Sequence, residues 1–264
     1  MRDGFVAAPA AIDGTPVTLL VDTGAEGTLV TPDLADALHL PRDNRHLSRL
    51  YGPGGELLSA NAALRSLRVG PFDLPDRRVN VGALPQNRGN AGPFGGILGA
   101  DILAHFDVDL DIPRGELTFY AVQDCAGRFL PWDAPYGAVP ALRSRYDRFL
   151  VSLEVDGTPL SAVLDSGARA SVMSEAAAAR LDVDAQALAG EPAGSGEGID
   201  RNAMTYHRHR FASVRVGAEV FNDQPIEVAP LRLREGDMLL GADFLRTRRV
   251  WISYSTGQVF IAAP

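Results

Sequence analysis

The pattern of apolar and polar positions along the chain predicts a mostly β protein. Short apolar runs on both sides of a glycine-containing turn are typical of β-hairpins. Such runs occur at 108–111 and 115–120, and again at 250–253 and 257–261. We therefore expect each half of the chain to end in a hairpin.

The helices are expected to be short. One is predicted at 32–40 and another at 174–181, where an alanine run follows a Ser-Glu start. A further short helix is expected after each of two Leu-Gly-Ala-Asp segments, which contain Gly99 and Gly241. These helices are minor elements in a β fold.

The chain contains an internal repeat. Residues 12–25 read Ile-Asp-Gly-Thr-Pro-Val-Thr-Leu-Leu-Val-Asp-Thr-Gly-Ala, and residues 155–168 read Val-Asp-Gly-Thr-Pro-Leu-Ser-Ala-Val-Leu-Asp-Ser-Gly-Ala. The offset between these two segments equals the offset between Gly99 and Gly241 to within a single position. Because two separate pairs of segments give nearly the same offset, the sequence indicates a duplicated domain.

The repeat divides the chain into an N-terminal lobe at 1–122 and a C-terminal lobe at 146–264, joined by a connector at 123–145. The connector carries several prolines and shows no sustained periodicity, which is typical of a linking segment.

Composition narrows the classes of partner. The formal net charge is −8, which argues against a nucleic acid held by phosphate attraction and favours a neutral or basic substrate. Cys125 is the only cysteine, so no intrachain disulfide can form. No run approaches the roughly 18 apolar residues of a membrane span, and residues 1–11 lack the pattern of a signal peptide. We expect a soluble chain in the cytoplasm or, if a targeting segment was removed, in the periplasm or outside the cell.

Two triplets at equivalent positions of the repeat are the candidate chemical groups. Each follows an apolar strand: Asp22-Thr23-Gly24 in the first half, and Asp-Ser-Gly at 165–167 in the second. Such a triplet places a carboxylate at the start of a tight turn, because glycine lets the backbone bend and the hydroxyl bonds to neighbouring backbone. One triplet alone is weak evidence, since Asp and Gly are ordinary turn residues. Two triplets in a duplicated domain can bring both carboxylates to one pseudo-twofold axis.

A second motif follows each triplet at matching distance. Two apolar residues and a glycine end at Gly99 after the first triplet and at Gly241 after the second, and the two spacings from the aspartate differ by a single position. With these motifs the chain resembles the retropepsin-like and pepsin-like aspartic peptidases, in particular bacterial proteins with two retropepsin-like domains in one chain. The resemblance covers nearly the whole chain. It implies two pseudo-twofold-related closed β-barrel lobes with short helices and an active-site cleft between them.

The resemblance also assigns roles to residues. It implies that Asp22 and Asp165 are catalytic and that Thr23 and Ser166 brace the two loops across the pseudo-axis. The other positions that it places in or beside the catalytic loops are Gly24, Gly167, Leu98, Gly99, Leu240 and Gly241.

The mechanism implied for this family is electrostatic. Two carboxylates about 3 Å apart cannot both ionise easily, so they share one proton and titrate as a coupled pair. One acts as general base on a water while the other, protonated, polarises the scissile carbonyl. No metal and no organic cofactor is required. The sequence does not determine which aspartate carries the proton.

Flaps are the next feature that the resemblance implies. In the family a hairpin flap covers the substrate about 30 residues after each catalytic aspartate, and glycine-rich segments lie at that distance here, at 50–56 and 194–199. Two such flaps would enclose an extended peptide. Tyr51 either contacts the substrate or packs locally. The candidate flap residues are Tyr51, Gly52, Gly54, Gly55, Ser195, Gly196, Glu197 and Gly198.

Three further groups of polar or charged residues are expected to have structural roles. His207 and His209 face one side of a predicted strand, but neighbouring arginines and the lack of an obvious third ligand favour a solvated strand over a metal site. Asp101 and Asp243 are expected to cap or brace the short helices. The arginines at 246, 248 and 249 are expected to form a surface patch, with a contact to the other lobe as the alternative.

The leading functional hypothesis is an aspartic endopeptidase acting on peptide or protein substrates. The alternatives are a catalytically silent module that binds peptides, and a dedicated protease that processes one substrate. The strong difference between the two flap sequences is compatible with the processing role. Because each half supplies one aspartate, we expect a functional monomer.

Overall fold

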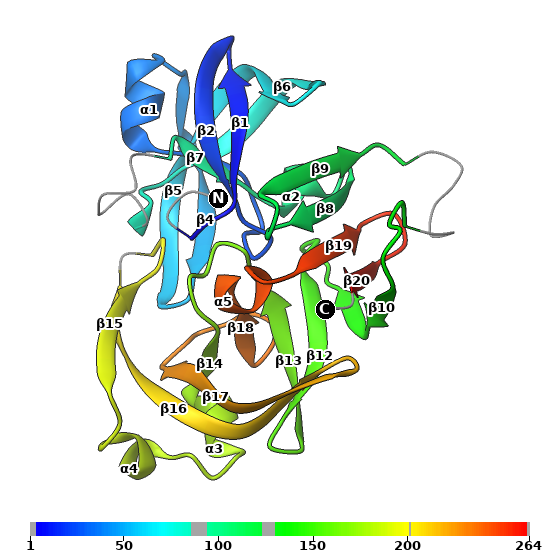
Figure 1. The fold of residues 1–264 in the computed structure, drawn as a ribbon. Helices are drawn as coiled ribbons and strands as arrows, with labels where there is room; N and C mark the ends of the chain where they lie inside the picture. Colours follow the sequence, from blue (N-terminus) through cyan, green and yellow to red (C-terminus); the bar gives the residue numbers. More distant parts are fainter. Residues whose placement is uncertain (1–3, 86–93, 123–129, 201, 263–264) are drawn as a thin grey trace.

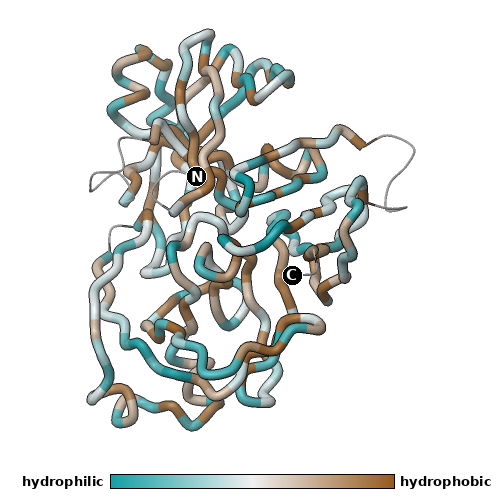
Figure 2. The backbone as a smooth tube through the Cα atoms, viewed as in Figure 1, coloured by the Kyte–Doolittle hydropathy of each residue, from teal (hydrophilic) through white to brown (hydrophobic). Residues whose placement is uncertain are grey.

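The computed structural model describes residues 4–85, 94–122, 130–200 and 202–262, and Cys125 lies outside these ranges. The described residues form a mostly β structure with short helices (Figure 1). Apolar and polar residues are interspersed along the backbone (Figure 2), as expected for strands with one face toward a core.

The first half forms a closed barrel. Its sheet has the strand order β1-β2-β7-β3-β6-β5-β4, and β1 also pairs with the C-terminal part of β5, so that six strands close on themselves. Strand β4 pairs with the N-terminal part of β5. The strands are β1 (Ala7–Ile12), β2 (Thr15–Val21), β3 (Leu29–Val30), β4 (Arg42–Gly52), β5 (Gly55–Val69), β6 (Phe72–Val81) and β7 (Gly96–Leu98).

The second half repeats this arrangement as a ring-like sheet. Its order is β11-β12-β13-β18-β14-β17-β16-β15, and β12 also pairs with β16. From β12 onward the order matches that of the first half strand for strand. The strands are β11 (Ala141–Arg143), β12 (Phe149–Val155), β13 (Thr158–Leu164), β14 (Val172–Ser174), β15 (Ala193–Glu197), β16 (Ala203–Val216), β17 (Glu219–Ala229) and β18 (Met238–Leu240).

A third sheet contains strands from both halves. The two predicted hairpins are present, and they lie edge to edge because β8 pairs with β19, with Asp109 opposite Trp251 (Figure 1). The strands, in the order β10-β20-β19-β8-β9, are β8 (Asp107–Asp111), β9 (Glu116–Tyr120), β10 (Tyr136–Val139), β19 (Arg249–Ser253) and β20 (Gln258–Ala262). Strands β10 and β11 fall inside the expected connector 123–145, which therefore contributes to two sheets.

The helices are short and begin at side-chain caps where the sequence offers one. Thr31 accepts a hydrogen bond from Leu34 N at the start of α1, and Ser174 accepts one from Ala177 N at the start of α3. The helices are α1 (Pro32–Ala37), α2 (Ala100–Leu103), α3 (Glu175–Ala179), α4 (Ala185–Leu188) and α5 (Ala242–Leu245). Helix α4 is an addition to the predicted set.

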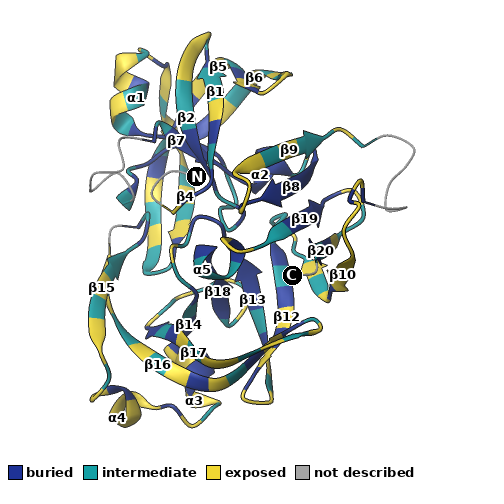
Figure 3. Ribbon diagram, viewed as in Figure 1, coloured by how far each residue is buried: buried dark blue, intermediate teal, exposed yellow. Residues whose placement is uncertain are grey.

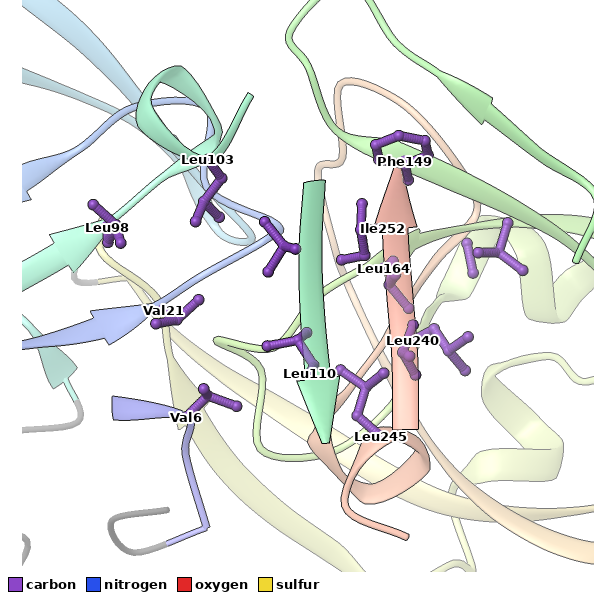
Figure 4. Packing of buried hydrophobic residues seen from close by; sticks show 14 of the residues in the cluster. Val6, Val21, Leu98, Leu103, Leu110, Phe149, Leu164, Leu240, Leu245 and Ile252 are labelled. Carbon is purple, nitrogen blue, oxygen red and sulfur yellow. The ribbon is translucent and has the colours of Figure 1, made fainter. Parts of the chain in front are cut away.

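One hydrophobic cluster runs through both halves. Figure 4 shows Val21 and Leu98 of the first barrel on one side of β8, and Leu164 and Leu240 of the second half beside β19. Strands β8 and β18 are fully buried, whereas α4 is mostly exposed (Figure 3). The shared core and the shared sheet hold the two triplet-bearing strands in a fixed relation.

Buried charge reinforces the shared sheet. Asp109, buried on β8, accepts hydrogen bonds from Arg249 at 2.7 Å and from Trp132 Nε1 at 3.0 Å. The surface-patch expectation for the arginines is therefore wrong for Arg249, which crosses to the other half. It is also wrong for Arg248, whose guanidinium is largely buried and bonds to Glu219 at 3.0 Å.

Candidate active site

The two triplets form the same turn. Asp22 Oδ1 accepts hydrogen bonds from the backbone N–H groups of Gly24 and Ala25, at 3.0 and 2.9 Å. Asp165 Oδ1 accepts the equivalent pair from Gly167 and Ala168, both at 2.9 Å. In each turn one carboxyl oxygen is thus fixed by the backbone, which orients the whole carboxyl group.

Four hydrogen bonds tie one turn to the other. Thr23 Oγ1 donates to Leu164 O at 2.6 Å and accepts from Ser166 N at 3.1 Å. In return Ser166 Oγ donates to Val21 O at 2.7 Å and accepts from Thr23 N at 3.1 Å. Both hydroxyl residues are buried, so these bonds lie away from water and fix the relative position of the turns.

The glycines allow the turns to approach each other closely. A Cβ atom on Gly24 would lie 2.6 Å from Asp165 Oδ2, and one on Gly167 would lie 2.7 Å from Asp22 Oδ1. No side chain fits at those distances, so only glycine at these positions lets each carboxyl group lie against the opposite turn.

The carboxyl groups of Asp22 and Asp165 each lie against the opposite turn and interact with each other, and both have raised pKa values. Burial is the largest cause of the raised pKa at each group, and the neighbouring carboxyl is the next cause at Asp22. The positive charge of Arg148 and the backbone donors oppose the rise in the pKa of Asp165. The pair therefore retains a proton at a pH where an ordinary aspartate has lost it.

The apolar-apolar-glycine motifs lie directly beside these turns. Strand β7 runs parallel to β2 and β18 parallel to β13, so that Asp22 N donates to Leu98 O at 3.1 Å and Asp165 N to Leu240 O at 2.9 Å. A Cβ atom on Gly99 would meet Gly27 O at 2.7 Å.

The aspartates that follow these glycines brace the neighbouring loops. Asp101 accepts hydrogen bonds from the backbone and hydroxyl of Thr28, at 2.8 and 2.7 Å, and Asp243 accepts one from the hydroxyl of Ser171 at 2.8 Å. Neither helix receives a side-chain cap at its N-cap glycine. Asp101 and Asp243 therefore join the short helices to the loops that follow the triplets, and Asp243 Oδ1 also accepts a hydrogen bond from Phe244 N of its own helix at 2.8 Å.

A cavity of about 740 Å³ lies between the halves, and both Asp22 and Asp165 line it. Its walls include residues of both candidate flaps and of the strands below them. The predicted substrate-binding residues among them are Tyr51, Gly52, Ser195, Gly196, Glu197 and Gly198, and Leu50, Pro53 and Ile199 of the same segments also line the cavity. The arrangement places two carboxyl groups with raised pKa values at the wall of one groove.

These features are explained by a family relationship. Residues 8–102 and 151–244 both match the sequence profile described as Aspartyl protease, and together they make up well over half of the chain. The chain belongs to the aspartyl protease family. Comparison with curated proteins gives no significant match.

In this family member the two matched segments each contain one triplet and one apolar-apolar-glycine motif. The described residues include no helix long and apolar enough to cross a membrane. Nor do the described ranges bring together three or more His, Cys, Asp or Glu side chains in a group that could hold a metal ion.

The two candidate flap hairpins meet at their tips. The tip of the β4–β5 hairpin contacts the tip of the β15–β16 hairpin, where Gly54 N donates to Asp200 Oδ2 at 2.9 Å and Asn202 Nδ2 donates to Gly54 O at 3.2 Å. Figure 1 shows these hairpins approaching each other from the two halves. Gly54 and Gly55 therefore contact the second flap, and they do not line the cavity.

Sequence reasoning missed the residues that join the flap tips. Asp200 is buried, and its side chain also accepts a hydrogen bond from Asn202 N at 2.8 Å. This bond forms an Asx-turn, a local turn that aspartate favours. The sequence could have indicated this local turn, but it could not indicate the contact of Asp200 with Gly54, 146 residues away.

The two histidines lie on β16 in different surroundings. His209 Nδ1 is 3.1 Å from Glu191 Oε1, and its ring packs on Phe211 at 4.8 Å between centroids. His207 Nδ1 is buried without a hydrogen-bond partner among the described residues.

Proposed function

We propose that this family member is an aspartic endopeptidase in which Asp22 and Asp165 activate a water molecule for attack on a peptide bond. The observation that carries the proposal is the pair of interacting carboxyl groups at the wall of the cavity, with Asp165 buried, Asp22 half-buried and both pKa values raised. A pair that keeps one proton holds a general base and a general acid at once. The base takes a proton from water, and the acid polarises the carbonyl.

The proposal extends to the organisation of the chain. The lobes at 1–122 and 146–264 each supply one aspartate, related by a pseudo-twofold axis through the Thr23 and Ser166 hydrogen bonds. A single chain then holds a complete dyad, so the active unit is a monomer. Sedimentation of the active protein at monomer mass supports this, and activity confined to a dimer contradicts it.

The proposed substrate is a peptide in an extended conformation. Flap strands β4 and β15 offer backbone donors and acceptors beside the cavity, and main-chain pairing with such strands is a common mode of peptide binding. Gly52, Ser195 and Gly196 present little side chain to the cavity, which favours close approach of a peptide backbone. Tyr51 and Glu197 differ in chemistry between the flaps.

The test is cleavage of a mixed peptide library between pH 3 and 8, with products identified by mass spectrometry. We expect cleavage by the unaltered protein, inhibition by pepstatin, and loss of cleavage in Asp22→Asn and Asp165→Asn. Asp33→Asn, which alters an exposed aspartate of α1, is the matched control and should cleave normally.

Each other outcome has a defined meaning. Cleavage that persists in both Asn variants refutes the assignment of the dyad. Binding of library peptides without cleavage favours the silent peptide-binding module, and cleavage of only a few related sequences favours the dedicated processing protease.

A further inference from the structure

The two halves match closely at the triplets but differ around the rim of the cavity. Four residues after each aspartate the chain has Glu26 in the first half and Arg169 in the second, and both line the cavity. The flap strands also differ: Tyr51 pairs with Glu56 across the first hairpin, and Glu197 takes the same place in the second. The rim is therefore chemically asymmetric although the turns beneath it are alike.

Arg234 contacts residues of both halves at this rim. It belongs to the segment between β17 and β18 of the second half, and its guanidinium lies 3.9 Å from the ring centroid of Tyr51 on the first flap. The guanidinium also lies 4.1 Å from the ring centroid of Tyr146 and hydrogen-bonds to the hydroxyl of that residue. Its Nη1 atom contacts both carboxyl oxygens of Glu26, at 3.2 and 3.0 Å.

The same segment also binds the backbone of the flap. Arg232 N donates to Pro53 O, at the tip of the first flap, at 2.8 Å. Two residues of one segment, 232 and 234, thus hold the first flap by its backbone and by its aromatic side chain. Glu26 receives a second cation from the second half, since Arg148 Nη2 lies 3.5 Å from it.

We propose that Arg234 is a positioning residue that holds the first flap closed over one end of the cleft, by stacking on Tyr51 while it anchors Glu26. Arginine suits this role because its planar guanidinium can stack on a ring and donate in-plane hydrogen bonds at the same time, which the lysine ammonium cannot. The consequence of these contacts for peptide binding rests on the proposed function.

The contacts of Arg234 with Tyr51 and Glu26, here called the clamp, make the two ends of the groove different. At the flap position equivalent to Tyr51 the second half has Glu197, which offers no ring on which a guanidinium could stack. The equivalent of Glu26, Arg169, stacks instead on Phe5 near the N-terminus, at 4.7 Å. The two ends of the cleft therefore close by different contacts, so a bound peptide meets different surroundings on the two sides of the dyad.

Hydrogen exchange on the intact protein tests the clamp without requiring activity. In Arg234→Ala, which loses both the cation–π contact and the ion pair with Glu26, we expect peptides covering 45–56 to exchange roughly tenfold faster than in the unaltered protein. Tyr51→Leu loses the cation–π contact alone, so its exchange in this segment should rise by less. Peptides covering 193–200 should change less. Tyr51→Phe keeps the ring and should keep the protection, and Arg234→Lys should restore it only in part.

Arg215→Ala is the matched control, because Arg215 forms an exposed ion pair with Glu154 at 3.2 Å away from the cavity. Its exchange in 45–56 should equal that of the unaltered protein. Unchanged exchange of this segment in Arg234→Ala overturns the inference, whether or not the protein cleaves peptides.

Kinetics separate the clamp from the proposed function. If the unaltered protein cleaves peptides, Arg234→Ala should raise KM several-fold and change kcat by less than about twofold, because the dyad is untouched. If kcat falls while KM stays unchanged, a positioning role through the flap is refuted. If the unaltered protein cleaves nothing, the proposed function fails, and the exchange measurement alone decides the fate of the clamp.

Discussion

Replacing Thr23 with valine removes one hydroxyl from the network between the two turns while keeping a β-branched side chain of similar shape. Two groups lose a partner: Leu164 O loses a donor at 2.6 Å, and Ser166 N loses an acceptor at 3.1 Å. Both lie in buried surroundings, where a polar group without a partner costs about 1–3 kcal/mol. We therefore expect Thr23→Val to lower the free energy of unfolding by roughly 2–6 kcal/mol.

The loss is large beside the roughly 5–15 kcal/mol that stabilises a typical folded protein. Urea unfolding followed by far-UV circular dichroism measures it, and Thr23→Ser is the control because it keeps the hydroxyl and loses one methyl, worth about 0.8 kcal/mol. The double variant Thr23→Val with Ser166→Ala should lose less than the sum of the single losses, because the two residues bond to each other's backbone within one network. A Thr23→Val protein as stable as Thr23→Ser would refute the reasoning.

Two further predictions concern the dyad and its glycines. Because the pKa of Asp22 is raised in the folded protein, ionisation of the pair destabilises the fold, and this part of the stability is present below the ordinary value of 3.8 and lost as the pH rises through the folded pKa. Asp22→Asn should therefore melt above the unaltered protein at pH 7, with the gap narrowing toward pH 4, and a gap that widens on acidification contradicts the assignment. Gly24→Ala places a Cβ atom 2.6 Å from Asp165 Oδ2, so it should cost about 1–3 kcal/mol of stability and abolish cleavage. Gly190→Ala, where a Cβ atom meets nothing within 4 Å, should change neither, as melting curves and peptide cleavage will show.

Local patterns in the sequence predict the strands, the hairpins and the short helices, because alternation, turn glycines and caps act over a few residues. The repeat adds the pairing of Asp22 with Asp165, since equivalent segments of a duplicated domain are expected to occupy equivalent places. The third sheet lies beyond this reasoning. The antiparallel pairing of β8 with β19 joins strands from different halves of the chain, and neither strand carries a local mark of its partner.

Charged residues are the clearest case of a role decided by tertiary structure. Arg249 follows a helix in a run of arginines and has the sequence context of a surface residue, yet it bonds to the buried Asp109 of the other half at 2.7 Å. Arg234 lies in a polar segment without periodicity, and only the fold brings it to Tyr51 and Glu26. An ion pair across two domains leaves no spacing pattern, so sequence analysis assigns such residues to the surface by default.

The differences between the two halves show where one chain departs from twofold symmetry. The turns require equal geometry on both sides, because each carboxyl group lies against the opposite glycine and each hydroxyl bonds to the opposite strand. The rim carries no such requirement. There the equivalent positions hold Glu26 and Arg169 in one pair and Tyr51 and Glu197 in the other. A dimer of identical chains could not place different residues at these positions, so fusion of the two halves allows a symmetric dyad to lie in a groove with two unlike ends.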